Sequence, residues 1–263
     1  MLTLYHFGGA ICAQKVRLAL AEKGVEWDSK ECVGPTLRDS DYLRLNPSGV
    51  VPTLVHDGHV LTESRIISEY IDEAFDGPAL MPSDPVARHR ARWWSKQVDD
   101  SLHLNVFILT FASMARGMFL AMPPEARAKA MPGLLDPVKR KISNELLDSG
   151  MTSSWVAMAI ERFRRLADEI EEQLSASRYL AGERYSLADA DYTAYINRLS
   201  DLGLGALWSA KPALNRWWDE MRQRPSYQPA ITAWRTEQDR ASYAQASELC
   251  QAAVSAHPAT GSN

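Results

Sequence analysis

The sequence predicts an α/β domain followed by an all-helical domain. Over the first 75 residues, β-rich runs alternate with helical patterns in the order strand, helix, strand, hairpin, helix. This order is typical of a small mixed sheet with helices. Beyond residue 86, apolar residues recur at helical spacing and no strand pattern is found. The proline-rich stretch from Asp76 to Pro85 separates the two parts.

The domain boundaries follow from these changes in pattern. We expect an N-terminal domain over residues 1–76 and a helical domain over residues 86–250. Residues 251–263 are rich in small and polar side chains, and we expect them to form a disordered tail.

Local signals indicate the first elements. The run from Leu2 to Phe7 predicts a strand, and the next helix is expected to begin at Ala13 or Gln14 and to close at Gly24. A second extended stretch is expected over residues 27–33.

A hairpin and a helix complete the N-terminal domain. Asp57 and Gly58 stand between two β-rich runs, which is a strong signal for a two-residue hairpin. Ser64 is expected to cap the following helix, whose apolar residues run from Ile66 to Phe75.

The helical domain contains patterns of different length. A long pattern runs over residues 86–116 with a broad apolar face, and another runs over residues 153–176. Further helices are expected over residues 187–202 and 212–223. No internal repeat is found in the sequence.

Composition limits the classes of function. Of 263 residues, 46% are hydrophobic, and the formal net charge of −4 is mild and unclustered, so neither nucleic acid nor a membrane is an expected partner. Met1 leads directly into a strand without a signal peptide, and no apolar run approaches the roughly 20 residues that span a bilayer. The 3 cysteines are far apart, which argues against a disulfide framework. We expect a soluble cytoplasmic protein.

Cys12 lies between the first strand and the first helix. A thiol at a helix N-terminus faces unpaired N–H groups and the positive end of the helix dipole, which favour the thiolate. Two interpretations are open: a reactive or anion-holding site, or a small buried residue that closes a turn.

Val51 and Pro52 form a second candidate element. Proline inside a β-rich run lacks an N–H, so it is unusual there. A cis bond before Pro52 would turn the N–H and C=O of Val51 outward, where they can pair with an extended peptide. An ordinary trans proline at a sheet edge explains the pattern equally well.

Glu63 and Ser64 form a third candidate element at the start of the helix after the hairpin. A serine hydroxyl and the first N–H groups of a helix suit a carboxylate, and Glu63 suits an ammonium group. Together they would hold the head of a free amino acid, although any serine cap has this form.

These elements occur in an order that resembles the cytosolic glutathione transferase family, from about residue 2 to residue 235. The resemblance rests on Ile11–Arg17, Asn46–Leu54, Thr62–Ser64 and Tyr185–Asp191, the last with a capping box of Ser186 and Asp189. Within the family, the phrase from Tyr42 to Asn46 and the insert near residues 117–152 are similar to bacterial members near tetrachlorohydroquinone dehalogenase and the β-etherases.

The resemblance implies a thioredoxin-like N-terminal domain that binds glutathione and an all-α C-terminal domain. Val51, before a cis Pro52, would pair with the cysteinyl main chain of glutathione. Glu63 and Ser64 would hold its γ-glutamyl ammonium and carboxylate groups, and Arg44 its glycine carboxylate. The resemblance also implies a homodimer and a role in detoxification.

The chain departs from the family at the expected serine positions. Many relatives carry serine two residues before or one residue after the place of Cys12, where this chain has Ala10 and Ala13. Cys12 is therefore the leading catalytic candidate, with Tyr5 on the first strand as the weaker alternative.

Three functions are compatible with these residues. The first is a transferase that conjugates glutathione to a hydrophobic, aromatic or halogenated electrophile, with Cys12 stabilising the glutathione thiolate. The second is a glutathione-dependent reductase or dehalogenase with Cys12 as a monothiol redox nucleophile. The third is a glutathione-binding module without turnover.

The remaining candidate residues give weaker indications of a functional site. Cys32 lies in an expected strand, and His56 and His59 flank the hairpin without a third ligand nearby, so no metal site is expected. The aromatic run over residues 107–119 fits either a hydrophobic substrate pocket or the helical core.

Overall fold

The computed structural model describes residues 1–130 and 136–258. The chain forms two compact units that are interleaved along the sequence. The first unit comprises residues 1–96, 176–195 and 216–235, and the second comprises residues 97–175, 196–215 and 236–263. The predicted domains, in contrast, follow one another along the chain.

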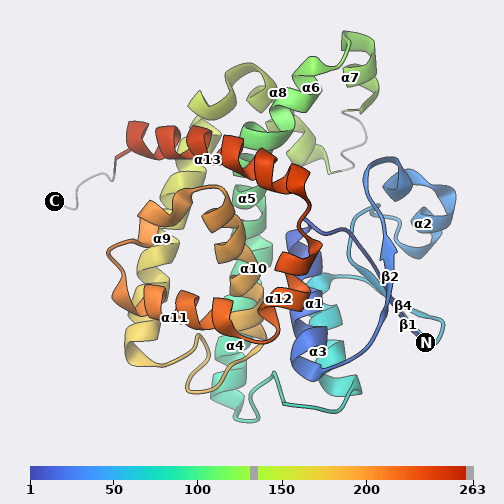
Figure 1. Ribbon diagram of the computed structural model, residues 1–263, viewed down its shortest axis with the longest axis vertical. Helices are drawn as coiled ribbons and strands as arrows, with labels where there is room; N and C mark the ends of the chain where they lie inside the picture. Colours follow the sequence, from blue (N-terminus) through green and yellow to red (C-terminus); the bar gives the residue numbers. More distant parts are fainter. Residues whose placement is uncertain (131–135, 259–263) are drawn as a thin grey trace. The chain divides into compact units, whose positions relative to one another are not determined.

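The first unit contains a four-stranded mixed sheet (Figure 1). Its strand order is β2-β1-β3-β4. β1 pairs in parallel with β2, whereas β3 is antiparallel to both β1 and β4. The strands are β1 (Leu2–His6), β2 (Asp28–Glu31), β3 (Thr53–His56) and β4 (His59–Leu61). The helices that lie wholly in this unit are α1 (Ile11–Lys23), α2 (Ser40–Leu45), α3 (Ser64–Ala74) and α12 (Tyr227–Ala230).

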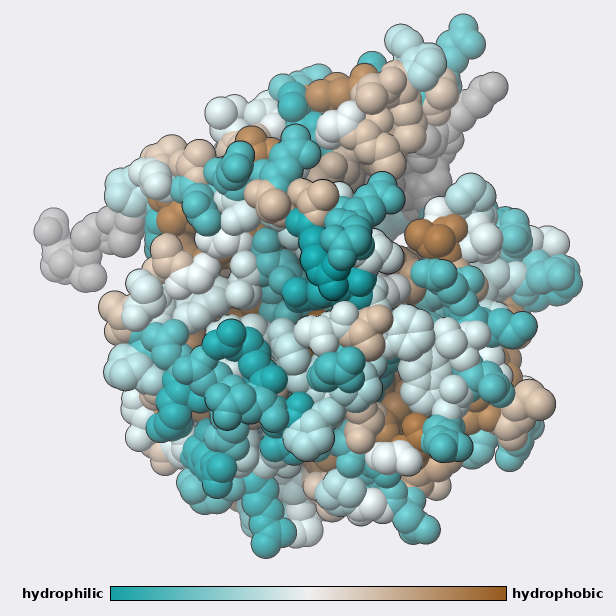
Figure 2. All heavy atoms as spheres, in the orientation of Figure 1, coloured by the Kyte–Doolittle hydropathy of each residue, from teal (hydrophilic) through white to brown (hydrophobic). Residues whose placement is uncertain are grey.

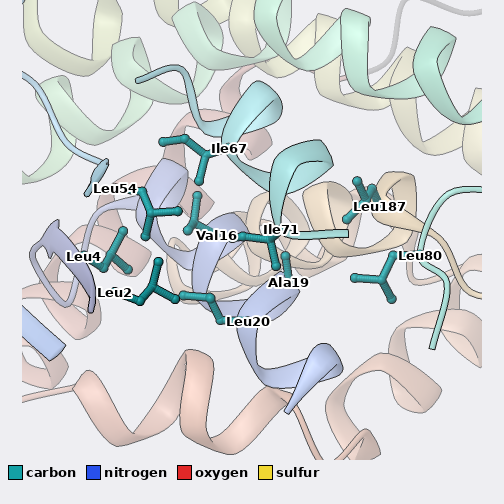
Figure 3. Close-up of a cluster of buried hydrophobic side chains, with 10 residues drawn as sticks. All are labelled: Leu2, Leu4, Val16, Ala19, Leu20, Leu54, Ile67, Ile71, Leu80 and Leu187. Carbon is teal, nitrogen blue, oxygen red and sulfur yellow. The ribbon is translucent and has the colours of Figure 1, made fainter. Parts of the chain in front are cut away.

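The core of this unit lies between the sheet and two helices. Figure 3 shows Ile67 and Ile71 of α3 close to Val16 of α1, with Leu54 of the sheet beside them. All four side chains are fully buried. Burying each of them contributes about 1.5–3 kcal/mol, so this cluster fixes α1 and α3 on the same face of the sheet.

The described part of the second unit is helical. Its helices are α5 (His103–Thr110), α6 (Arg116–Ala121), α7 (Pro124–Ala130), α8 (Pro137–Ser149), α9 (Ser154–Ala176, whose last residue belongs to the first unit) and α13 (Glu237–Ala256). α4 (Pro85–Gln97), α10 (Leu187–Asp201) and α11 (Pro212–Gln223) contribute residues to both units. Beyond residue 86, the described residues hold one isolated β-bridge, between Tyr179 and Gly182, and no strand. The predicted fold class, an α/β thioredoxin-like domain plus an all-α domain, is confirmed.

The predicted helix over residues 86–116 is part of a longer one. Residues 85–121 form a continuous helix with π-helical turns at Val98–Leu102 and Phe111–Ala115. By length and composition this helix is apolar enough to cross a membrane, which differs from the sequence expectation. Core helices of soluble proteins pass the same test; in this helix 33% of the most apolar 18-residue window is buried, and Leu102 and Leu109 of the helix are fully buried.

Two predicted boundaries at helix ends are wrong. α13 runs to Ala256, so residues 251–256 are helical and not a disordered tail. The helix continues past the predicted end because Ala253 is part of its buried face. Residues 259–263 of the predicted tail lie outside the described residues. α1 begins at Ile11, two residues before the earlier of its predicted starts, because the extended Ala10 is already its cap: the Ala10 carbonyl accepts the first helical bond, from the Gln14 N–H at 2.9 Å.

The predicted pair of Ser186 and Asp189 is present at the start of α10. The Asp189 carboxylate accepts bonds from the Ser186 N–H and hydroxyl, both at 2.9 Å, and from Trp217 Nε1 at 2.9 Å. Because the group is fully buried, desolvation raises the pKa of Asp189 to about 6. The carboxylate thus joins α10 to α11 within the first unit.

Candidate functional site

Three loops of the first unit meet at one edge of the sheet. β1 ends at His6, and Tyr5 pairs with Thr53, the first residue of β3. Leu54 pairs with Leu61, the last residue of β4. Because β3 is antiparallel to both neighbours, the connections that lead to Cys12, contain Val51 and lead to Glu63 all lie at this edge of the sheet. The register therefore brings together the three elements singled out in the sequence.

Cys12 is the second residue of α1 and is partly buried. It shares a helix face with Val16 and Ala19, which lie four and seven residues further on and pack in the core with α3. α1 and α3 both begin at the same sheet edge, so Cys12 faces the start of α3. The first-turn N–H groups of α1 point to this edge, where they favour an anion.

The segment before β3 turns through a cis bond between Val51 and Pro52. Of the two interpretations, the cis form is the one present. Pro52 is buried, and Val51 is partly exposed. Among the described residues, the structure gives no hydrogen bond to the main chain of Val51.

Glu63, and not Ser64, is the residue that caps α3. Its main chain has φ of 68° and ψ of 104°, a conformation that is rare outside glycine and common at functional sites. Ser64 is the first residue of α3 and is 8% exposed, whereas the Glu63 side chain is exposed. The cap lies one residue earlier than predicted, because Ser64 already belongs to the helix and Glu63, with its positive φ, is the last residue outside it. Both groups still lie at the N-terminus of α3.

Two arginines lie near the Val51 segment. Arg44, the residue expected from the sequence, is in α2, and its exposed guanidinium bonds to Asp41 at 2.6 Å. Arg38 was missed: its Nη1 donates to the Gly49 carbonyl at 2.8 Å, two residues before Val51. The sequence carried no signal for Arg38, because its contact depends on how the loop folds back.

A buried cation lies behind the turn that leads to Cys12. Arg17 donates to the carbonyls of Phe7 at 3.3 Å and Gly8 at 2.8 Å, and its Nε donates to Ala230 at 2.7 Å. Its guanidinium lies 5.2 Å from the ring centre of Trp234. Burial lowers the pKa of Arg17 to about 9, so it stays charged at neutral pH. This arrangement was also missed, because Ala230 is 213 residues away in sequence.

His6 completes the cluster behind the turn. Its Nδ1 accepts from Arg17 at 2.9 Å, and its Nε2 lies 2.8 Å from the Ser29 hydroxyl. Burial, and then the charge of Arg17, lower the pKa of His6 to about 4. The imidazole is therefore neutral at physiological pH. It acts as an acceptor for Arg17 and not as a catalytic base at the surface.

Of the other sequence candidates, Tyr5 lies at this edge, where it pairs with Thr53. Tyr5 points to Tyr42, with ring centres 5.8 Å apart. Burial raises the pKa of Cys32 and also raises the pKa of Cys250 to about 11. Among the described residues, no group of three or more His, Cys, Asp or Glu side chains suits a metal ion.

The second unit holds the aromatic run. The ring centres of Phe107 and Phe111 are 5.8 Å apart, and Phe111 stacks on Phe119 at 5.5 Å. Phe111 is buried, whereas Phe107 and Phe119 are half-buried, and Met118 is exposed. Phe111 therefore belongs to the core, whereas the other named side chains of the run remain at least partly accessible to solvent. Figure 2 shows mostly hydrophilic residues on the face drawn, with hydrophobic residues in small separate patches.

Comparison with known families agrees with this architecture. Residues 11–74 match the model for the N-terminal domain of glutathione S-transferases, and residues 153–225 match the model for the C-terminal domain. The chain is a member of the glutathione S-transferase family. Glutathione is therefore its co-substrate, and the first matched region contains Cys12, Val51, Glu63 and Ser64.

Two of the relatives of this chain are bacterial proteins. It is 30% identical to the tetrachloro-p-hydroquinone reductive dehalogenase of Sphingobium chlorophenolicum, over 87% of this chain and 95% of that protein. It is 31% identical to LigF of Sphingobium sp. strain SYK-6, over 86% and 91%. The crystal structure of the β-etherase LigF superposes with a TM-score of 0.77 at 28% identity, over 87% of this chain and 98% of that one. The expected neighbours within the family are thus confirmed.

A different kind of relative is also present. The chain is 27% identical to a stringent starvation protein A homolog of Pasteurella multocida, over 88% of this chain and 90% of that protein. Membership of the family therefore supports glutathione-dependent activity without fixing the substrate or the reaction.

Proposed function

We propose that the protein conjugates glutathione to a hydrophobic electrophile that is aromatic or halogenated. The observation that carries this proposal is the meeting of Cys12, Val51 and the start of α3 at one sheet edge. An extended tripeptide that carries a thiol would need three partners along its length: a group beside its sulfur, a main-chain group to pair with, and a polar helix start for its charged end.

Each part of glutathione has a matching group. The Val51 main chain would pair with the cysteinyl residue in the manner of an added strand. Ser64 and the first N–H groups of α3 would hold the γ-glutamyl carboxylate, and the exposed Glu63 would hold its ammonium group. Arg44 was the expected partner of the glycine carboxylate, and Arg38 is a second candidate because Gly49 holds it beside the turn.

Cys12 would then act on the glutathione sulfur. A partly buried thiol in the first turn of α1 lies among N–H groups that favour negative charge. These groups would lower the pKa of the glutathione thiol, so that the thiolate attacks the electrophilic carbon and displaces its leaving group. The half-buried Phe107 and Phe119 are the candidates for a hydrophobic pocket within the second unit.

A second candidate function is reductive dehalogenation with Cys12 as the nucleophile. The similarity to a reductive dehalogenase favours it. The Cys12 thiolate would attack the sulfur of a glutathionyl–aryl conjugate, and the carbon would leave as the reduced aryl compound after taking a proton. The resulting Cys12–glutathione disulfide would be cleaved by a second glutathione, which yields oxidised glutathione and restores Cys12. A binding module without turnover is the third candidate, supported by the stringent starvation protein relative.

Replacement of Cys12 separates these functions. For the transferase, Cys12→Ala should lower kcat/KM for conjugation of a chlorodinitrobenzene about 10²-fold, whereas Cys12→Ser should keep most of the activity because the hydroxyl still donates. For the reductase, both variants should lose product and the disulfide with glutathione, which mass spectrometry detects in the parent protein. Cys32→Ala is the matched control, because that thiol is buried.

Three results would change the assignment. Conjugation that neither variant alters would remove Cys12 from catalysis. Loss of thiol–disulfide activity with retained conjugation would exclude a main redox role. Tight glutathione binding without turnover on a broad panel of electrophiles would favour the binding module.

We also propose that the protein is a cytoplasmic homodimer. The support from its surface is a pair of exposed apolar side chains, Ile66 of α3 at 63% and Trp93 of α4 at 48% exposure. The two helices are joined beside them by the ion pair of Glu69 and Arg92 at 2.7 Å.

A further inference from the structure

A buried network holds the peptide group that precedes Val51. The Tyr42 hydroxyl donates to the Val50 carbonyl at 2.6 Å, and Asn46 Nδ2 donates to the same oxygen at 2.9 Å. Tyr42 and Asn46 are each 4% exposed. One carbonyl oxygen thus receives two donors from side chains that are almost out of contact with solvent.

The direction of the Val51 N–H follows from this arrangement. The Val50 carbonyl and the Val51 N–H belong to one peptide group, and that bond is trans, since the cis bond in this segment is the next one. In a trans peptide the C=O and the N–H point in opposite directions. With its carbonyl held by Tyr42 and Asn46, the group must point its N–H away from them.

The same network is anchored to the sheet. The Thr53 hydroxyl lies 3.0 Å from the Tyr42 hydroxyl and 3.1 Å from Asn46 Nδ2, and Thr53 is fully buried. Thr53 pairs with Tyr5 at the start of β3. The plane of the peptide group is therefore fixed relative to the strand and not only within its own loop.

Tyr42 and Asn46 differ in the other hydrogen bonds that their side chains make. Asn46 Oδ1 also accepts from the Ser48 N–H at 3.1 Å, so it shapes the turn itself. The Tyr42 hydroxyl bonds to the Val50 carbonyl and lies within hydrogen-bond reach of Thr53 and Asn46, but among the described residues it makes no bond to the turn at Ser48. Its removal is therefore the cleaner way to release the peptide group.

We propose that Tyr42 is a positioning residue for the thiol peptide, acting through the Val50–Val51 peptide group. Its hydroxyl orients the Val51 N–H toward a main-chain carbonyl of the bound tripeptide. A carbonyl that accepts two hydrogen bonds also makes the N–H of its own peptide group a stronger donor. This inference rests on the proposed glutathione site and adds to it a residue that does not touch the ligand.

The test is Tyr42→Phe, with glutathione binding measured by calorimetry and conjugation measured by steady-state kinetics. The Kd and KM for glutathione should rise about three- to tenfold, the value of a typical hydrogen bond, with kcat at saturating glutathione within twofold. The rate of Cys12 alkylation at neutral pH and the Tm should stay close to those of the parent protein. Tyr70→Phe is the control, because it removes a hydroxyl that bonds to His56 at 2.7 Å, at the opposite end of β3.

A double-variant cycle isolates the route through Val51. Val51→Pro removes the N–H in question, so adding Tyr42→Phe to it should cause no further loss of glutathione affinity. Equal losses from Tyr42→Phe with and without Val51→Pro would overturn the inference. An unchanged Kd in Tyr42→Phe, or a raised Kd with equally altered Cys12 alkylation and Tm, would also overturn it. In each of these cases the proposed glutathione site would still stand. A parent protein that does not bind glutathione would instead remove both proposals.

Discussion

Arg17 and His6 lie directly behind the turn that leads to Cys12. The guanidinium bonds to two carbonyls of that turn and to the imidazole, and within the described residues it has no carboxylate partner. Its positive charge therefore remains near the start of α1. If the proposed thiolate is held at this edge, the charge of Arg17 would support it together with the helix amides.

The buried imidazole gives a pH dependence with a definite sign. The pKa of His6 is about 4 in the folded protein against an ordinary value of 6.5, so its contribution to stability is complete above pH 6.5 and is lost as the pH falls toward 4. We expect the NMR titration of His6 to have a midpoint near 4. The difference in unfolding free energy between the parent protein and His6→Gln should rise with pH between these values.

The comparison with His6→Gln is needed because a second group, Asp189, changes the unfolding free energy with pH in the opposite direction. The pKa of Asp189 is about 6, so its contribution is lost as the pH rises through that value. Both proteins in the comparison carry Asp189, and its effect cancels. A His6 midpoint near 6.5, or a difference that does not depend on pH, would contradict this account.

The turn between β1 and α1 depends on a close approach of two chain segments. A Cβ atom on Gly8 would lie 2.4 Å from the main-chain oxygen of Trp234. This oxygen cannot move without shifting the helical turn Thr232–Trp234. The element that positions Cys12 is thus packed against a segment from the far end of the sequence.

We expect Gly8→Ala to destabilise the protein by about 1–3 kcal/mol, because the methyl group overpacks this contact. The glutathione KM should rise as well, since the displaced turn carries Cys12. Urea unfolding and steady-state kinetics measure the two effects. Gly117→Ala is the control: it lies in α6 with open space around it, and it should stabilise the helix by about 1 kcal/mol. Equal effects of the two substitutions would exclude the contact with Trp234 as the cause.

At the scale of the whole molecule, the family pairs a glutathione-binding unit with a helical unit. The two matched regions lie at 11–74 and 153–225, and the helices between them hold the aromatic run. The relatives named as a reductive dehalogenase, the β-etherase LigF and a stringent starvation protein A homolog match most of this chain, so membership of the family does not by itself fix the reaction.

The proposed dimer is tested by a charge on its exposed apolar patch. Ile66→Glu should convert a dimer into a monomer in light scattering, because it places a carboxylate where an apolar contact is expected. Met158→Glu is the control, since Met158 is 60% exposed on α9 in the other unit. A parent protein of monomeric mass, or an Ile66→Glu variant that stays dimeric, would exclude this surface as the interface.

Much of the N-terminal unit was predictable because its signals are local. The Asp57-Gly58 hairpin, Gly24 at the end of α1 and the Ser186–Asp189 pair depend on residues a few positions apart. The errors also have local causes. α1 begins early because Ala10 is already its cap, and Glu63 is the cap of α3 because its positive φ lies outside the helical region.

The sequence alone determined the succession of strands and helices and the family, and it singled out Cys12, Val51, Glu63 and Ser64 as candidate site residues. These follow from propensity and motif order, which act over short distances. The tertiary structure decided which groups support the site: Tyr42 on the Val50 carbonyl, Arg38 on Gly49, and Arg17 on the turn before Cys12. Those contacts arise when the sheet register and the burial of α1 bring separate segments together, and no local pattern encodes them.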